Sequence, residues 1–179
     1  MKSVEAIKIL HRCDLEGRIL FRSRELGALF DERGDTLRST IKRLTADGIL
    51  ERVAHDAYLY LLFHPNGCDL LGHIAAFLRP GGATYESLES AASQWGFISQ
   101  IPLGRISCVT TGAEGLVDTR FGAIEFVHTD DDLDAVKRGI IDRMPRNRLP
   151  IATEERCLHD LVSRKRSLEL IDWDEVDVD

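Results

Sequence analysis

The sequence predicts an α+β protein built from two domains, residues 1–63 and residues 68–179. Two observations predict this class. Before residue 63, apolar residues recur at helical spacing in three runs, and two short strand-like runs follow the third. Beyond residue 105 the period changes, because three β-rich segments are separated by glycines. A chain of 179 residues has the length of one ordinary domain or two small ones.

The first two helices are expected between residues 3 and 30. Ser3 is of a type that caps helix N-termini, and apolar residues between positions 4 and 13 recur at helical spacing. Gly17 ends this helix, and residues 18–21 form a short strand-like run. Ser23 can cap a second helix over residues 24–30.

A third helix is expected from Asp35, whose carboxylate can accept the free N–H groups of a helix start. Its apolar side, which must be buried, carries Leu37, Ile41 and Leu44. The opposite side carries Ser39, Lys42, Arg43 and Ala46, with Arg38 at its flank. The outer face of this helix is therefore basic in a chain whose net charge is −7.

A hairpin follows the third helix. Residues 49–53 and 57–62 form two strand-like runs joined by the turn Ala54-His55-Asp56. Helix, strand, helix, helix, strand, strand is the element order of a winged helix-turn-helix, whose third helix enters the DNA major groove. Residues 64–67 then break the pattern and are expected to be a linker.

The second domain is expected to contain helices over residues 70–78 and 85–96, followed by a small antiparallel meander. Its three strands are predicted over residues 106–111, 116–121 and 123–129. A last helix over residues 152–166 has Thr153 as its cap. In the acidic tail, Leu170, Ile171 and Trp173 are candidates for packing onto the domain.

Charge divides the chain in the same place. Residues 1–63 carry eleven Lys or Arg and ten Asp or Glu, whereas residues 64–179 carry twelve and twenty. The acidic excess thus belongs to the second domain, and the net charge is no objection to DNA binding by the first. No apolar run approaches the roughly 20 residues of a membrane span, and no signal peptide is evident, which favours a cytoplasmic protein without membrane contact.

The central run of the second domain resembles the AbiEi-type antitoxins of type IV toxin–antitoxin systems, which act in phage defence. In that family a Y-x-S-L-E-S-A helix leads through S-Q-I-P into a strand ending in T-T-G, and F-G-x-I-E-F-x-H-T follows. The matching pieces are residues 85–91, 99–102, 110–112 and 121–129. Residues 152–160 are similar to the family's A-x-P-E-R-A-L-x-D helix, with Glu154 at the proline position.

This resemblance implies a transcriptional regulator whose winged helix binds double-stranded operator DNA and represses its own operon. It also implies that the second domain antagonises a nucleotidyltransferase-like toxin, with no need for a stable complex. A homodimer on a palindromic operator is plausible because one winged helix reads few base pairs. The alternative is a protein-interaction module whose winged helix docks a partner in place of DNA.

For a repressor, phosphate contacts supply affinity and base-edge contacts supply sequence preference. Arg38 and Arg43 are candidates to read guanine, and Lys42 could read a base or hold a phosphate. The remaining candidates for DNA contact are Ser39 and Thr40 on the same helix, Arg22 and Arg24 at the start of the second helix, and Arg33 and His55 with less weight.

A second basic cluster is a candidate surface for nucleic acid or for an acidic partner, although a plain solvated surface explains it equally well. It comprises Lys137, Arg138, Arg143, Arg146 and Arg148. Three histidines lie near cysteines, but the four cysteines lack paired metal-ligand spacing, so reduced and buried thiols are expected.

No enzyme is expected, because no nucleophile elbow, phosphate-binding loop or dinucleotide fingerprint occurs in the sequence. Glu86 and Glu89 are expected on the solvated face of one helix. The aspartates between positions 130 and 134 lack the glycine and distal glutamate of a calcium loop, so a turn is the simpler interpretation. We expect no catalytic site, no cofactor and no metal.

Overall fold

The computed structural model describes residues 1–63, 69–80, 83–100, 103–143 and 149–173. The chain divides into two compact units, Met1–Gly67 and Cys68–Asp179. Both units combine helices with a β-sheet, so the protein is of the α+β class. Among the described residues, no helix has the length and apolar character needed to cross a bilayer.

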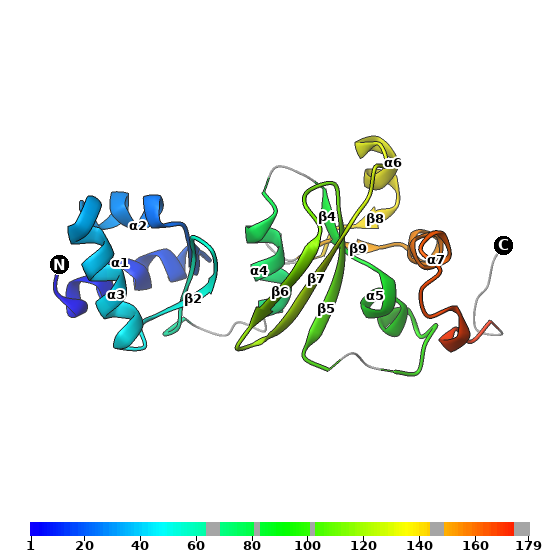
Figure 1. The fold of residues 1–179 in the computed structure, drawn as a ribbon, viewed down its shortest axis with the longest axis horizontal. Helices are drawn as coiled ribbons and strands as arrows, with labels where there is room; N and C mark the ends of the chain where they lie inside the picture. Colours follow the sequence, from blue (N-terminus) through cyan, green and yellow to red (C-terminus); the bar gives the residue numbers. More distant parts are fainter. Residues whose placement is uncertain (64–68, 81–82, 101–102, 144–148, 174–179) are drawn as a thin grey trace. The chain divides into compact units, whose positions relative to one another are not determined.

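The N-terminal unit packs three helices on a three-stranded antiparallel sheet (Figure 1). The strands lie in the order β1-β3-β2. The elements are α1 (Ser3–Leu15), β1 (Leu20–Phe21), α2 (Ser23–Phe30), α3 (Gly34–Ala46), β2 (Leu50–Ala54) and β3 (Ala57–Tyr60). The predicted helices, strand and hairpin of this unit are all present, with ends shifted by at most two residues.

The helix starts differ from the expected ones. Lys2, Arg22 and Arg33 occupy the N-cap positions of α1, α2 and α3. Ser3 and Ser23 are therefore the first helical residues, and Asp35 lies inside the first turn of α3. In α1 and α2 the glutamate at the third helical position takes over the capping role, since its carboxylate accepts the N–H of the N-cap residue.

The apolar faces of α1, α2 and α3 pack against the sheet and form the core of this unit. Its fully buried side chains include Leu10, Leu26, Leu44, Leu50 and Tyr60. Leu50 lies opposite Tyr60 in the β2–β3 ladder, and the register shifts between Arg52 and Ala54. Asp56 takes the left-handed conformation, at φ 52°, that the tight turn requires.

The C-terminal unit is built on a six-stranded mixed sheet in the order β6-β7-β5-β4-β9-β8. Its strands are β4 (Thr84–Glu86), β5 (Arg105–Thr110), β6 (Gly115–Thr119), β7 (Gly122–His128), β8 (Ile140–Ile141) and β9 (Ile151–Ala152). Its helices are α4 (Leu70–Leu78), α5 (Leu88–Trp95), α6 (Leu133–Arg138), α7 (Glu154–Ser163) and the 3₁₀ turn Leu168–Leu170. Figure 1 shows α4 on one face of the sheet and α5 with α7 on the other.

The predicted antiparallel meander was wrong in its pairing, although its three strands exist. β7 lies between β6 and β5; it pairs antiparallel with β6 and parallel with β5. The burial of the strands explains this order. β5 is buried at all positions but its first and therefore needs a neighbour on each side, whereas β6 is mostly exposed and suits a sheet edge.

The predicted helix over residues 85–96 was wrong in its first turn. Tyr85 and Glu86 belong to β4, where they lie opposite Val109 and Cys108 of β5. The helix begins only at Leu88, which adopts a left-handed φ of 55° at the corner between strand and helix. Placing Tyr85 in the sheet buries its ring completely, an environment that an exposed helix start would not supply.

The last helix is shorter than predicted. The Thr153 hydroxyl accepts the Arg156 N–H at 3.2 Å and caps α7, as expected, but α7 ends at Ser163, and Lys165 turns the chain at φ 51°. Downstream, Ile171 is buried, as predicted, whereas Trp173 is half exposed and does not pack as predicted.

Candidate nucleic-acid interface

A groove lies between the outer side of α3 and the β2–β3 hairpin. Its volume is about 540 Å³. Leu37 and Ile41 of α3 and Tyr58 of β3 supply apolar lining. Its charge comes from Arg38, Lys42 and Arg52, and the described lining includes no carboxylate. The groove is therefore positively charged within a unit that is close to neutral.

Two of these cations are the predicted residues of α3. Arg38 is 81% exposed and forms an ion pair with Asp35, 93% exposed, at 2.8 Å. Lys42 is exposed one turn further along the helix, and Ser39 is exposed beside them. Ion pairs between side chains this open to water are weak, so Arg38 is available to another anion.

Arg52 was missed by the sequence analysis. It is exposed on β2, opposite Tyr58, and its Nε donates to the Ala54 carbonyl at 3.3 Å. The hairpin thus turns a cation toward the α3 side of the groove. The sequence does carry a signal at this position, because Arg52 is a polar residue shortly before the turn of the hairpin. The register shift after Arg52, however, hides the alternation that would reveal which face of the sheet its side chain lies on.

Two of the predicted contacts on α3, Thr40 and Arg43, do not line the groove. Thr40 is 2% exposed, so it faces the core and cannot reach DNA. Its hydroxyl helps the terminal amine of Met1, the larger influence, to hold the pKa of Glu32 below its ordinary value. Arg43 is exposed but lies away from the groove, where its guanidinium donates to the Met1 carbonyl.

At the start of α2, protein carboxylates already accept from the backbone N–H groups that a phosphate would use. The Arg22 N–H donates to Glu25 at 2.5 Å, and the Ser23 N–H donates to Asp56 at 2.9 Å. Hydrogen bonds from Ser23 hold the pKa of Asp56 below its usual range. A phosphate would have to displace these carboxylates, which disfavours the predicted role of Arg22.

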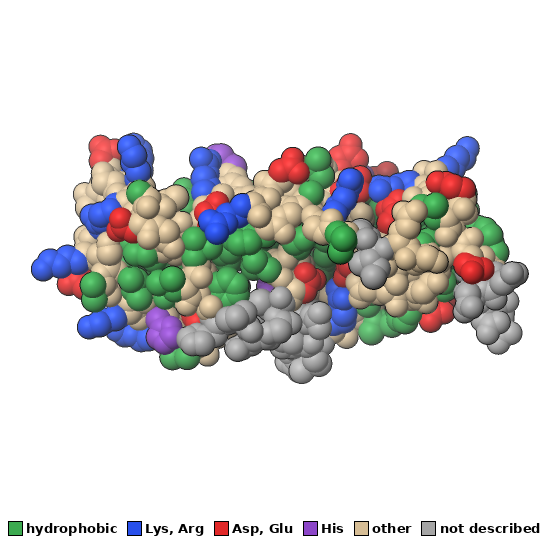
Figure 2. All heavy atoms as spheres, turned by 90° about the horizontal axis from the view of Figure 1, so that it is seen from below, with side chains coloured by type: hydrophobic (Ala, Val, Ile, Leu, Met, Phe, Trp, Pro, Cys, Tyr) green, Lys and Arg blue, Asp and Glu red, His purple; other side chains and the backbone are tan. Residues whose placement is uncertain are grey.

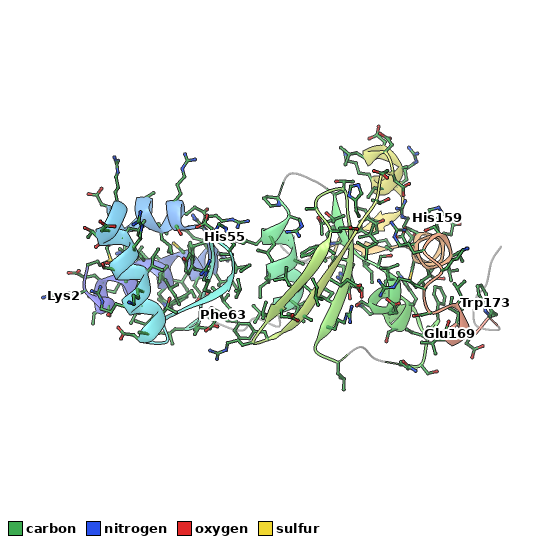
Figure 3. The ribbon with its side chains drawn as sticks, in the orientation of Figure 1. Lys2, His55, Phe63, His159, Glu169 and Trp173 are labelled. Carbon is green, nitrogen blue, oxygen red and sulfur yellow. The ribbon has the colours of Figure 1, made fainter. Side chains whose placement is uncertain are left out.

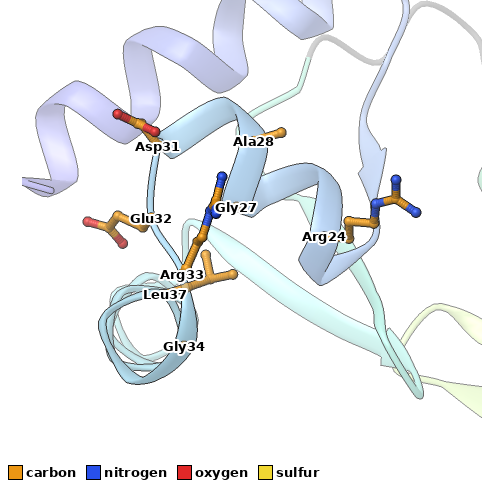
Figure 4. A pocket seen from close by; sticks show the side chains of 8 residues that line it. All are labelled: Arg24, Gly27, Ala28, Asp31, Glu32, Arg33, Gly34 and Leu37. Atoms are coloured by element: carbon orange, nitrogen blue, oxygen red, sulfur yellow. The ribbon is translucent and has the colours of Figure 1, made fainter.

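Arg24 and His55 remain exposed, as a DNA contact requires. Arg24 lies on the rim of a second hollow of about 460 Å³ between α2 and α3, where Arg33 stands near Asp31 and Glu32 (Figure 4). His55 lies at the tip of the β2–β3 hairpin (Figure 3). The mixed charge of the second hollow makes it a weaker anion site than the groove.

The basic cluster of the C-terminal unit is not a single surface. The Arg143 side chain is 16% exposed and donates to Glu86 at 2.5 Å, to Gln94 and to the Leu149 carbonyl. Lys137 and Arg138 are exposed on α6, and Lys137 is 4.0 Å from Asp134. Arg146 and Arg148 lie outside the described residues. Figure 2 shows Lys and Arg side chains interspersed with Asp and Glu on the face it displays.

A buried polar network joins β4, α5 and α7 in the C-terminal unit. Its centre is the Asp160 carboxylate, fully buried, which accepts the Tyr85 and Ser87 hydroxyls at 3.0 and 2.8 Å. Arg156 and Arg164 balance its charge at 3.1 and 3.4 Å. These contacts satisfy a charged group that would otherwise be costly to bury.

A second network excludes the predicted solvated face for Glu86 and Glu89. Glu86 is buried with Arg143, and Glu89 receives two hydrogen bonds from Arg166. Arg166 also donates to Glu125 at 3.0 Å. The two glutamates thus hold separate parts of the unit together through different arginines.

Asp131, His159 and Asp160 bring potential metal ligands within 4.8 Å of one another. His159 lies on α7 (Figure 3) and is largely exposed. The Arg156 guanidinium, however, donates to Asp131 and pairs with Asp160, so an arginine already occupies the position that a cation would need. These residues therefore do not fit a metal ion.

The described cysteines behave as small apolar residues. Cys13, Cys108 and Cys157 are buried free thiols. Burial raises the pKa of all three, in the case of Cys157 to about 12, so they stay protonated and unreactive. Cys68 lies outside the described residues.

Comparison with known proteins bears on the fold alone. No protein-family model and no curated protein matches the sequence. Among solved structures, the chain is similar to the crystal structure of the RV2827C protein from Mycobacterium tuberculosis, with a TM-score of 0.63 and 16% identity. The match covers 92% of this chain and 62% of that chain, so this chain spans less than two thirds of the mycobacterial protein.

Proposed function

We propose that the N-terminal unit is a winged helix-turn-helix that binds double-stranded DNA, and that the protein is a transcriptional repressor. In this proposal α3 is the recognition helix and the β2–β3 hairpin is the wing. The element order of the unit and its antiparallel sheet are those of this class.

The observation that carries the proposal is the groove between α3 and the hairpin, with three exposed cations and no carboxylate in its described lining. Lys42 and Arg52 come from opposite sides of the groove and can each neutralise a phosphate. Arg38, with its planar fork of donors, suits the O6 and N7 acceptors of guanine. Ser39 can bond either a base or a phosphate.

The regulatory target rests on the family resemblance. By that resemblance the repressor acts on its own operon, and the C-terminal unit antagonises a nucleotidyltransferase-like toxin without needing a stable complex. A dimer on a palindromic operator would extend the few base pairs that one winged helix reads. Tyr85, Ser87 and Asp160, which the matching segments supply, form the buried network of that unit. They support a shared fold, and the surface that would act against the toxin is left to experiment.

Fluorescence anisotropy of the full chain against its upstream DNA and a scrambled duplex, over a salt series, tests the repressor proposal. We expect at least tenfold preference for the upstream DNA and a salt slope of about 0.9 per phosphate neutralised. Replacing Arg38, Lys42 and Arg52 together by Gln should abolish binding. The matched control replaces three exposed cations at α1, Lys2, Lys8 and Arg12, by Gln. Once the general effect of the altered net charge on affinity is subtracted, this control should bind DNA as the parent does.

The antitoxin proposal has a separate test. A neighbouring reading frame that encodes a nucleotidyltransferase should arrest growth when expressed alone, and co-expression of this chain should restore growth. The triple Gln variant of the groove should still restore growth, because antagonism is assigned to the other unit. Loss of rescue in that variant would place the antagonism on the DNA-binding unit.

A protein-docking role is the second candidate, and the apolar side chains of Leu37, Ile41 and Tyr58 in the groove favour it. A docking groove would bind no duplex even at low salt. It would tolerate the triple Gln change and lose its partner when Tyr58 is replaced by Ala.

A further inference from the structure

The N-terminal half of α3 presents an aspartate in its first turn and an arginine three residues later, side by side and exposed to solvent. Arg38 Nη1 lies 2.8 Å from Asp35 Oδ1, and both side chains are more than four fifths exposed. Arg38 also lines the groove beside Lys42. If α3 enters the major groove, its N-terminal residues are the ones that reach base edges.

Two simpler explanations account for Asp35 only in part. A carboxylate in the first turn interacts favourably with the helix dipole, and an exposed ion pair adds a little stability. Neither effect requires the carboxylate to stand next to a DNA-facing arginine. On such a face a negative charge repels every phosphate, so it lowers affinity for all sequences alike. A residue that lowers general affinity is useful there only if it discriminates between sequences.

We propose that Asp35 and Arg38 form one base-reading pair that selects a G·C-containing step, an inference that rests on the proposed DNA binding. Arg38 donates to O6 and N7 of guanine, and Asp35 accepts from the N4 amino group of cytosine. Asp35 also orients the guanidinium, since the ion pair restricts a long side chain before it meets the base. At thymine or guanine, Asp35 faces only acceptors, O4 in thymine and O6 and N7 in guanine, and is repelled.

Selection from a library of duplexes with a randomised core, using the full chain, tests this pair. The parent should enrich a cytosine at one position near an enriched guanine. Asp35→Ala should lose that cytosine preference by about tenfold while the guanine remains. Asp35→Asn should shift the position toward adenine, because an amide bonds adenine N6 and N7.

Asp47→Asn is the matched control. Asp47 is an exposed carboxylate just beyond the other end of α3, and an amide oxygen can still accept the bond that Ser3 donates to it. We expect Asp47→Asn to raise affinity for every duplex slightly and to leave the selected sequence unchanged.

Each outcome is informative. If the parent and both Asp35 variants enrich the same sequence with the same preferences, Asp35 reads no base, and the pair is overturned while DNA binding stands. If Asp47→Asn changes the sequence preference as Asp35→Ala does, removal of a negative charge explains both results, and the base-reading pair is overturned. If the parent enriches no sequence and binds no duplex at low salt, the proposed DNA binding fails and this inference fails with it.

Discussion

The two units use the same side-chain pair in opposite ways. In the N-terminal unit, Arg38 and Asp35 meet at 2.8 Å with both side chains in solvent. In the C-terminal unit, Arg156 and Asp160 meet at 3.1 Å with exposed fractions of 9% and 0%. The first pair can exchange partners at little cost, whereas the second is shielded from solvent and its partners all belong to the fold.

The residues that carry the family resemblance belong to the buried kind of contact. The matching segments supply Tyr85, Ser87, Glu89 and Asp160, and all four are bound to partners inside the C-terminal unit. Such residues specify how β4, α5 and α7 fit together. Residues that bind a partner must instead keep free donors or acceptors at the surface, as Arg38 and Lys42 do.

The largest effect is expected from Asp160→Ala. Removing this carboxylate leaves the buried Arg156 with only one of its two carboxylate partners, Asp131, and deprives Tyr85 and Ser87 of their acceptor. Breaking one side of a buried pair costs about 3–5 kcal/mol, which should unfold the C-terminal unit or bring it close to unfolding. Urea unfolding followed by circular dichroism measures the loss.

Asp35→Ala is the counterpart in the exposed pair and should change the free energy of unfolding by less than about 1 kcal/mol. A double variant, Asp160→Leu with Arg156→Met, should lose less stability than Asp160→Ala, because it leaves fewer buried charges unpaired. Equal losses for Asp160→Ala and Asp35→Ala would remove the distinction between the two pairs.

Acid should weaken the C-terminal unit next most strongly. Burial alone would raise the pKa of Glu125, but hydrogen bonds and charge from Arg166 and Arg105 outweigh it and lower the pKa. Arg156 likewise lowers the pKa of Asp131 through a hydrogen bond. The unfolded chain therefore binds protons first as the pH falls, so this stability is complete above the ordinary carboxyl pKa of about 4 and is lost below it.

Urea midpoints measured between neutral pH and acid test this linkage. Glu125→Gln removes one of the titrating groups, so its midpoint should fall less steeply with acid than that of the parent. A slope equal to the parent's would show that the contacts of Glu125 are not linked to folding.

The helices with a regular apolar spacing could be predicted from the sequence, whereas the strand order of the C-terminal sheet could not. Leu37, Ile41 and Leu44 recur at helical spacing, so the buried side of α3 could be read directly. The order of β5, β6 and β7 depends on which strands are covered on both faces, a property of the assembled unit. Tyr85 is a second example, because its strand forms by pairing with β5, and the residues next to Tyr85 in the sequence do not indicate that pairing.

The candidate site was predictable in part for a similar reason. A helical projection correctly placed Arg38, Ser39 and Lys42 outside, but Thr40 lies at the edge of the apolar stripe and turned inward. Arg52 joined the site through strand pairing, which the sequence does not display. Arg143 was grouped with a surface cluster by sequence proximity, although its partner Glu86 lies 57 residues away.

A smaller effect is expected from Arg52→Gln. If Arg52 holds a phosphate, its loss should weaken binding to all duplexes about equally and reduce the salt slope by about 0.9. Fold stability should change little, because the Arg52 side chain is exposed. Anisotropy titrations at several salt concentrations give both quantities, and a sequence-dependent loss would instead assign Arg52 to base reading.

The smallest effect is expected from Lys137→Gln combined with Arg138→Gln. Both side chains are exposed on α6, and Lys137 meets Asp134 only at 4.0 Å, so stability should change by less than about 0.5 kcal/mol. Arg143→Gln is the contrasting variant, because it leaves the buried Glu86 without its cation and should destabilise the unit by several times as much. A loss of DNA affinity in the α6 double variant, with its stability intact, would show that the C-terminal unit also contacts nucleic acid.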